Sequence, residues 1–160
     1  MLTNNLIKEL NKALPKENIL SEIEERYVYS IDASNDPYAK TTLPDAVVFV
    51  ENIEQVQKVV KIANKQMIPI ICRGAGTNTV GACVTTHGGI ILNFSKMNKI
   101  LEINPDNMTV RVQPGVIVGD LQNEVEKIGL FYPPDPSNLK VSTTGGSIAQ
   151  NSAGARCFKY

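Results

Sequence analysis

The feature that most constrains the fold is a strand–helix–strand pattern followed by a glycine-rich loop. Ala46–Val50 is a short, continuous apolar run, as expected for a buried strand, and Met67–Cys72 is a second such run. Between them, Asn52 is a good helix cap and Gln55 stands at the third helical position. The apolar stripe of this helix consists of Ile53, Val56, Val59, Val60 and Ala63. The pattern predicts a β-α-β unit, with parallel pairing expected if both strands share one sheet.

Shorter elements are predicted on the N-terminal side of this unit. Residues Leu2–Leu14 have apolar side chains at helical spacing and are followed by Pro15, which favours a helix that ends there. Ser21 is a good cap for a second helix that begins with acidic residues. The stretch Tyr29–Pro37 is rich in turn-forming residues and is predicted to be a loop.

Strands and one more helix are predicted on the C-terminal side. Gly89–Asn93 is a third apolar run, and Ile100–Ile103 and Met108–Val112 flank a turn-forming connector, which predicts a hairpin. Val118–Ile128 has an apolar helical stripe of Val118, Leu121, Val125 and Ile128. Gly129 stands where a C-terminal cap glycine belongs.

Composition excludes several classes of protein. Lys+Arg and Asp+Glu number 16 each, so the chain lacks the basic excess of a nucleic-acid-binding protein. No stretch approaches the roughly 20 apolar residues that cross a bilayer, so no transmembrane segment is predicted. The cysteines Cys72, Cys83 and Cys157 are widely spaced and form neither a disulfide framework nor a zinc pair. They are expected to be buried or half-buried thiols in a reducing cytoplasm.

The loop that follows the second apolar run could bind an anion. In Arg73–Asn78 the glycines allow positive φ and close approach, and successive N–H groups can form an anion-binding concavity. The Arg73 side chain and the Thr77 hydroxyl add donors. A dinucleotide-binding fingerprint fails because Thr79 replaces its third glycine, and a Walker loop fails because Ala82 replaces its lysine. A plain glycine-rich turn remains an alternative.

Two further segments have unusual composition. Thr143–Gly154 consists almost entirely of small residues, which let a backbone approach a flat ligand or another backbone. The alternative is a tight packing seam. Pro133–Pro136 is a rigid P-P-D-P loop, whose alternative is a purely structural turn.

In chain order, these segments carry a family resemblance. Together they resemble the FAD-binding domain of the vanillyl-alcohol oxidase/p-cresol methylhydroxylase (PCMH) superfamily. The resemblance rests on a strand followed by R-G-A-G-T-N, Gln113-Pro114-Gly115, P-P-D-P and T-G-G-S-I-A-x-N-S-x-G. Within this superfamily, the chain is most similar to the glycolate oxidase FAD-subunit and D-lactate dehydrogenase branch. Asp32-Ala33-Ser34 and the strand from Pro44 add to this likeness, which spans Tyr29 to Tyr160.

The resemblance implies an α+β fold of the PCMH type. Two small α/β subdomains, residues 41–98 and 99–160, would follow a lead-in of residues 1–40, with FAD lying between them. The first would hold the β-α-β unit and the second the hairpin and a helix. The fold would be incomplete at the C-terminus and would lack the substrate domain. The parent reaction would oxidise a D-2-hydroxy acid, such as glycolate or D-lactate, to a 2-oxo acid by hydride transfer to the flavin.

The resemblance also implies the residues that bind FAD. A first group would hold the diphosphate and continue along the cofactor: Arg73, Gly74, Ala75, Gly76, Thr77, Asn78 and Gly81. In a second group, Pro134 and Asp135 would line the path to the flavin. Thr143, Thr144, Gly145 and Gly146 would pack near the ring and the ribityl chain. Asn151 and Gly154 would close the diphosphate side. Thr77 stands where some members attach FAD through a histidine, so non-covalent FAD is expected. No residue is assigned as a catalytic acid or base or as a metal ligand.

Other functions remain open at this point. One is a reductase of the same fold, of the UDP-N-acetylenolpyruvoylglucosamine type, although the P-P-D-P loop speaks against it. The other is a non-catalytic module or interaction remnant. Expected partners of the parent enzyme are a small 2-hydroxy acid and an electron-acceptor protein or quinone. An exposed sheet edge would favour self-association into a homo-oligomer.

Overall fold

A computed structural model describes residues 2–34 and 41–160 of the chain, which divides into two compact units. Unit 1 is Met1–Lys96 and unit 2 is Met97–Tyr160. The predicted loop Tyr29–Pro37 is irregular as far as Ser34, and residues 35–37 lie outside the described residues. The predicted boundaries of a lead-in and two subdomains stay predictions.

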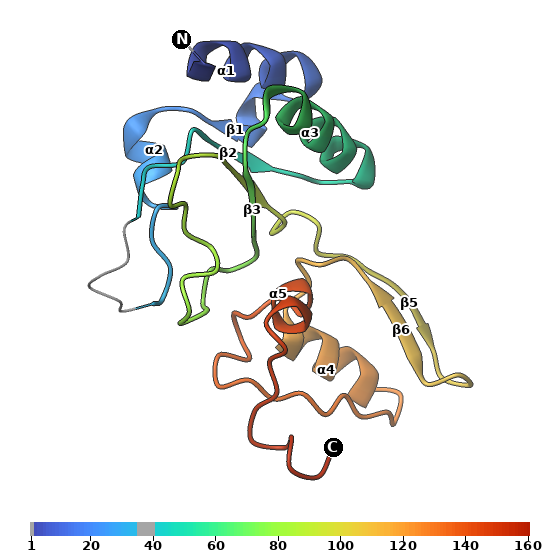
Figure 1. Cartoon of the computed structure of the whole chain (residues 1–160). Coiled ribbons are helices and arrows are strands. Elements are labelled where there is room, and N and C mark those ends of the chain that lie inside the picture. Colours follow the sequence, from blue (N-terminus) through green and yellow to red (C-terminus); the bar gives the residue numbers. More distant parts are fainter. Residues whose placement is uncertain (1, 35–40) are drawn as a thin grey trace. The chain divides into compact units, whose positions relative to one another are not determined.

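Unit 1 is built on a four-stranded mixed sheet (Figure 1). Its strands are β1 (Ile19–Leu20), β2 (Ala46–Phe49), β3 (Ile70–Arg73) and β4 (Ile90–Asn93), in the order β1-β2-β4-β3. β2 and β3 both pair in parallel with β4, and β1 runs antiparallel to β2. The predicted parallel β-α-β unit is therefore confirmed. Because β4 lies inside the sheet, all four of its residues are buried.

Helices α1 (Leu2–Ala13) and α3 (Ile53–Gln66) pack side by side in unit 1 (Figure 1). A 3₁₀ turn, η1 (Lys16–Asn18), follows α1. α3 begins as predicted, since Asn52 Oδ1 accepts a hydrogen bond from the Gln55 N–H at 2.9 Å. Its apolar stripe is narrower than predicted: Val59 and Ala63 are buried, but Ile53 is 63% and Val60 44% exposed.

Two sequence predictions in unit 1 are wrong in detail. The strand predicted from Met67 begins only at Ile70, because Met67 caps α3 in the left-handed conformation with φ 54°. β3 is also an edge strand, so Cys72 is exposed. The short helix α2 (Ile23–Tyr27) is capped by Glu22, whose N–H donates to the Glu25 carboxylate, and not by Ser21.

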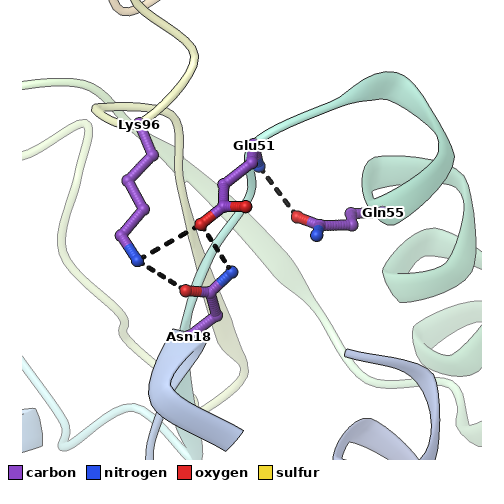
Figure 2. A network of polar contacts seen from close by, with 4 residues as sticks. All are labelled: Asn18, Glu51, Gln55 and Lys96. Atoms are coloured by element: carbon purple, nitrogen blue, oxygen red, sulfur yellow. Dashed lines mark hydrogen bonds and ion pairs between the residues drawn. The ribbon is translucent and has the colours of Figure 1, made fainter. Parts of the chain in front are cut away.

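A polar network joins three separate segments of unit 1 (Figure 2). Asn18, which is 1% exposed, donates from Nδ2 to Glu51 Oε1 at 3.1 Å. Lys96 donates to Asn18 Oδ1 and lies 3.4 Å from the same Glu51 oxygen. Gln55 accepts a hydrogen bond from the Glu51 N–H at 2.8 Å. The buried amide of Asn18 is thus paired on both its donor and its acceptor side, which removes the penalty for burying it.

Unit 2 contains a hairpin and two helices. Strands β5 (Ile100–Asn104) and β6 (Thr109–Val112) pair antiparallel, as predicted. Helix α4 (Val118–Glu126) ends two residues before the predicted Ile128. The predicted cap glycine is confirmed: Gly129 has φ 76°, its N–H donates to the Glu126 carbonyl, and the Leu130 N–H donates to the Val125 carbonyl. The stripe of α4 is one residue shorter than predicted, because Ile128 is 48% exposed. The core cluster is Val116, Leu121 and Val125, with Ile100, Ile103, Val110, Val112, Leu130 and Tyr132 against it.

The small-residue segment of unit 2 contains a helix that the sequence did not predict. Helix α5 (Thr144–Ala149) carries two glycines and no amphipathic stripe. It begins because the Thr143 hydroxyl accepts the Gly146 N–H at 3.2 Å, as an N-cap does.

Candidate functional site

The loop that follows β3 in unit 1 presents a row of free backbone donors. Among the described residues, no acceptor is found for the N–H groups of Gly74 to Thr79. Gly76 and Gly81 have φ of 73° and 71°, a backbone conformation that favours glycine. Because backbone N–H groups are obligatory hydrogen-bonding groups, such a row suits an anion with several oxygens.

The Arg73 side chain is turned back onto the protein. Its Nη1 donates to the carbonyl oxygens of Ile31 at 2.8 Å and Tyr29 at 3.5 Å, and the guanidinium lies 5.4 Å from the centre of the Tyr29 ring. A Cβ atom placed on Gly76 would overlap the guanidinium of Arg73. The φ of Gly76 therefore favours glycine here, and a side chain at this position would also displace the end of the Arg73 side chain.

Asp32 ties the segment before β2 to this same loop. Its Oδ2 accepts the Cys83 N–H at 3.3 Å, and its Oδ1 accepts the Ser34 N–H at 2.9 Å. Next to it, the Ala33 N–H donates to the Gly76 carbonyl at 3.2 Å. Burial acts to raise the pKa of Asp32, but hydrogen bonds, first from Ser34 and then from the Cys83 N–H, outweigh it and lower that pKa.

Asn78 shapes the second half of the loop. Its Oδ1 accepts the N–H groups of Val80 at 3.1 Å and Ala82 at 2.9 Å. Its Nδ2 is buried and makes no hydrogen bond within the described part of the chain. Asn78 therefore fixes the turn that follows the row of backbone donors.

In unit 2, the P-P-D-P loop is joined to the end of the small-residue segment. Asp135 forms an isolated parallel bridge with Gly154, and its N–H donates to the Ala153 carbonyl at 3.0 Å. Gly154 has φ 100°, and a Cβ there would overlap the Asp135 carbonyl oxygen. On the other side, buried Gln122 of α4 donates to the Pro134 carbonyl at 2.7 Å.

The start of α5 packs against the Q-P-G turn. The Gly145 N–H donates to the Pro114 carbonyl at 2.9 Å, and a Cβ on Gly145 would come within 2.6 Å of the Pro114 Cβ. Thr143 and Thr144 are buried, and their hydroxyls hydrogen-bond to neighbouring backbone. Close packing therefore accounts for the small side chain at Gly145, as it does at Gly154.

The predicted site residues thus fall into two groups, one in each unit. Arg73 is the last residue of β3, and residues 74–81 form a single loop in unit 1. In unit 2, Asp135 is bridged to Gly154, and Thr143–Gly146 forms the first turn of α5. Asn151, at φ 50°, lies just past the end of that helix. The assignment of these residues to a ligand stays a prediction.

Sequence reasoning missed two side chains that hold these loops in place. They are Asp32 and Gln122, whose partners lie 51 and 12 residues away. The only local signal was the serine two residues after Asp32, which is typical of an Asx turn.

The three cysteines are free thiols. Cys83 is buried, as expected, but Cys72 and Cys157 are exposed, contrary to expectation. Burial raises the pKa values of the Cys72 and Cys83 thiols, which disfavours the reactive thiolate. Within residues 2–34 and 41–160, no group of three or more His, Cys, Asp or Glu side chains could hold a metal ion. Nor is any helix of this described part long and apolar enough to cross a membrane.

Comparison with known proteins assigns the fold to a family. Residues 44–160 match the model of the FAD binding domain family. The chain is 42% identical, over its whole length, to the glycolate oxidase subunit GlcD of Bacillus subtilis, and 38% identical over 99% of its length to the D-lactate dehydrogenase of Anaerostipes hadrus. It spans 33% of each of these relatives.

A solved structure shows the same architecture. p-Cresol methylhydroxylase with bound substrate superposes with a TM-score of 0.80 and 27% identity, over 94% of this chain and 30% of that one. The α+β fold with one mixed and one antiparallel sheet is therefore the PCMH-type fold expected from the sequence. The chain belongs to the FAD-binding domain family of the PCMH-type flavoproteins.

Proposed function

We propose that this chain is the FAD-binding part of an oxidoreductase that oxidises a D-2-hydroxy acid of the glycolate or D-lactate type to a 2-oxo acid. The observation that carries the proposal is the row of N–H groups from Gly74 to Thr79 that find no acceptor within residues 2–34 and 41–160, in a chain of an FAD-binding family. The hydroxy-acid chemistry rests on relatives named glycolate oxidase subunit and D-lactate dehydrogenase.

In unit 1, the loop Arg73–Asn78 would bind the diphosphate, mainly through its backbone. The N–H groups without an acceptor in the described part of the chain, and the positive φ of Gly76, fit a ligand with several phosphate oxygens. Gly81, also at positive φ, would continue along the cofactor. When bound, FAD supplies the hydride-accepting chemistry, and the protein supplies binding and orientation.

In unit 2, the second group of predicted residues would contact the remaining parts of the cofactor. Pro134 and Asp135 would line the path to the flavin, and Thr143, Thr144, Gly145 and Gly146 would pack near the ring and ribityl chain. Asn151 and Gly154 would close the diphosphate side. The hydrogen bonds at Asp135, Gln122 and Thr143 support this proposal, because they fix the backbone of both segments without any ligand.

The attachment of FAD is proposed to be non-covalent. The covalent bond in some relatives uses a histidine in this loop, and Thr77 offers no imidazole at the corresponding place. His87 is the single histidine of the chain, and it is exposed and hydrogen-bonded to Thr86 at 2.9 Å. FAD bound to the chain should therefore be released completely when the protein is denatured.

The other partners belong to the same proposal. A small 2-hydroxy acid would be the substrate, and an electron-acceptor protein or quinone would receive the electrons. The cytoplasm is the proposed location, because a reducing compartment keeps free thiols such as these three from forming disulfides. The half-buried edge strand β3 is the place where pairing with a second copy would occur.

The test is a titration of the chain with FAD, followed by flavin fluorescence. Ala75→Asp places a negative charge within the diphosphate loop without changing a glycine, and Ala75→Asn is a control of the same shape without that charge. We expect saturable binding by the wild type, at least about tenfold weaker binding by Ala75→Asp, and near wild-type binding by Ala75→Asn. Equal FAD affinities for the two variants would contradict the diphosphate assignment.

A further inference from the structure

We propose that Asp32 is a positioning residue for the diphosphate loop, which it holds in a ligand-ready arrangement together with Arg73 before FAD binds. The inference rests on the proposed function, because it names the residues that organise the same site. Neither side chain needs to touch the cofactor. Their contacts with the protein carry the argument.

Three hydrogen bonds join residues 31–33 to the segment 73–83, and we call this set the clasp. Asp32 Oδ2 accepts the Cys83 N–H at 3.3 Å, near the end of the loop. Arg73 Nη1 donates to the Ile31 carbonyl at 2.8 Å, at the start of the loop. Between them, the Gly76 carbonyl accepts the Ala33 N–H at 3.2 Å. The loop is therefore fixed at its beginning, middle and end by one short segment.

The chemistry of Asp32 suits this task. A carboxylate only accepts hydrogen bonds, and its two oxygens here accept N–H groups from two different segments, Ser34 and Cys83. An asparagine would point its NH₂ group at one of these N–H donors and lose that link. A glutamate would keep both acceptors on a stem that is longer by one methylene group.

The Arg73 side chain packs against the loop at Gly76. Arg73 as a residue is 9% exposed. Its guanidinium donates to protein carbonyls, and a Cβ on Gly76 would overlap it. Next to this arginine, the Gly76 carbonyl accepts the Ala33 N–H, and the N–H groups of the loop find no acceptor among the described residues. A loop that is already ordered loses less conformational entropy when it binds a ligand.

The clasp can be tested in the ligand-free chain and in FAD binding with the same variants. Hydrogen exchange is read at the amides of Ala33 and Ala82, which bond to Gly76 and Asn78 and not to Asp32 itself. In Asp32→Asn, we expect exchange at both amides to be about tenfold faster and the Kd for FAD about tenfold higher. Asp32→Glu should rescue part of both effects, which a general loss of stability would not reproduce.

A second aspartate gives a matched control. Asp45 also accepts a backbone N–H, that of Gly89 at 2.7 Å. This hydrogen bond does not involve the segment 73–83. Asp45→Asn should leave exchange at Ala33 and Ala82 and the FAD affinity unchanged. Exchange at the buried β4 amides reports whether each variant is folded, and if Asp32→Asn is not, Asp32→Glu is compared with the wild type instead.

Two results would overturn the proposal. Unchanged exchange at Ala33 and Ala82 in the Asp32 variants would show that the clasp does not order the loop, even if FAD bound less tightly. Faster exchange with an unchanged FAD affinity would show that the order is irrelevant to the ligand. If the wild type binds no FAD at all, it is the proposed function that fails, and the exchange at the two amides still decides whether the clasp orders the loop.

Discussion

Backbone conformation and close packing restrict which residue type can stand at some positions of this chain. Gly154 and Gly129 both have positive φ, at 100° and 76°, so a side chain is unfavourable at either position. They differ in their surroundings: a Cβ at Gly154 would overlap the Asp135 carbonyl oxygen, whereas a Cβ at Gly129 would have no atom within 4 Å. The two glycines therefore separate the effect of backbone conformation from the effect of crowding.

Alanine substitutions measure this difference. Gly129→Ala should lower the free energy of unfolding by about 1–2 kcal/mol, the cost of a left-handed residue with a side chain. Gly154→Ala should lower it by about 3 kcal/mol or more, because the P-P-D-P loop must also move. Urea denaturation of both variants gives the comparison. Equal losses would show that the bridge between Asp135 and Gly154 is not tight in solution.

At the scale of elements, the sequence predicted structure wherever a local signal was strong. Three signals between residues close in sequence are confirmed: the Asn52 cap, the apolar run of β2 and the cap glycine after α4. Helix α5 was missed because its two glycines lower helix propensity, although Thr143 offers a local cap.

Tertiary position explains the other differences between sequence and structure. β3 reads as a buried strand in the sequence, but it lies at the sheet edge, where the proline of its predicted range, Pro69, is tolerated. The candidate loop 73–78 was identified from glycines and chain order, which are local features. Asp32 and Gln122 were missed because their partners are reached only after the chain has folded.

The element that holds the P-P-D-P loop is α4, through the side chain of Gln122. This buried amide donates from Nε2 to the carbonyls of Tyr132 at 3.2 Å and Pro134 at 2.7 Å. Gln122→Met should lower the free energy of unfolding by about 1–3 kcal/mol, since it leaves these carbonyls unpaired. Gln122→Glu should cost more, because a carboxylate would face them.

Asn123, the exposed neighbour on the same helix, provides the control. Asn123→Met removes an amide of similar chemistry from the surface and should change the free energy of unfolding by less than about 0.5 kcal/mol. Thermal and urea unfolding of the three variants would establish the order. If Gln122→Glu were as stable as the wild type, the two hydrogen bonds would not be important for this loop.

At the scale of the whole molecule, the two units have cores of different size. Unit 1 buries many apolar residues from α1, α3, β2 and β4, whereas the core cluster of unit 2 has three fully packed members, Val116, Leu121 and Val125. Buried apolar area is the main source of stability. We therefore expect two unfolding transitions in urea, with unit 2 unfolding first, as reported by hydrogen exchange at the amides of α4 and of β4.

FAD should shift these transitions according to where it binds. A ligand that binds only the folded state stabilises it by RT ln(1 + [L]/Kd), about 2.7 kcal/mol at 100 times Kd. Binding by the loop 73–78 must slow exchange in β4, because that loop belongs to unit 1. If Thr143–Gly146 and Gly154 also contact the cofactor, exchange in α4 slows at the same FAD concentrations. Protection of β4 alone would restrict the site to unit 1, and protection of α4 alone would contradict the diphosphate loop.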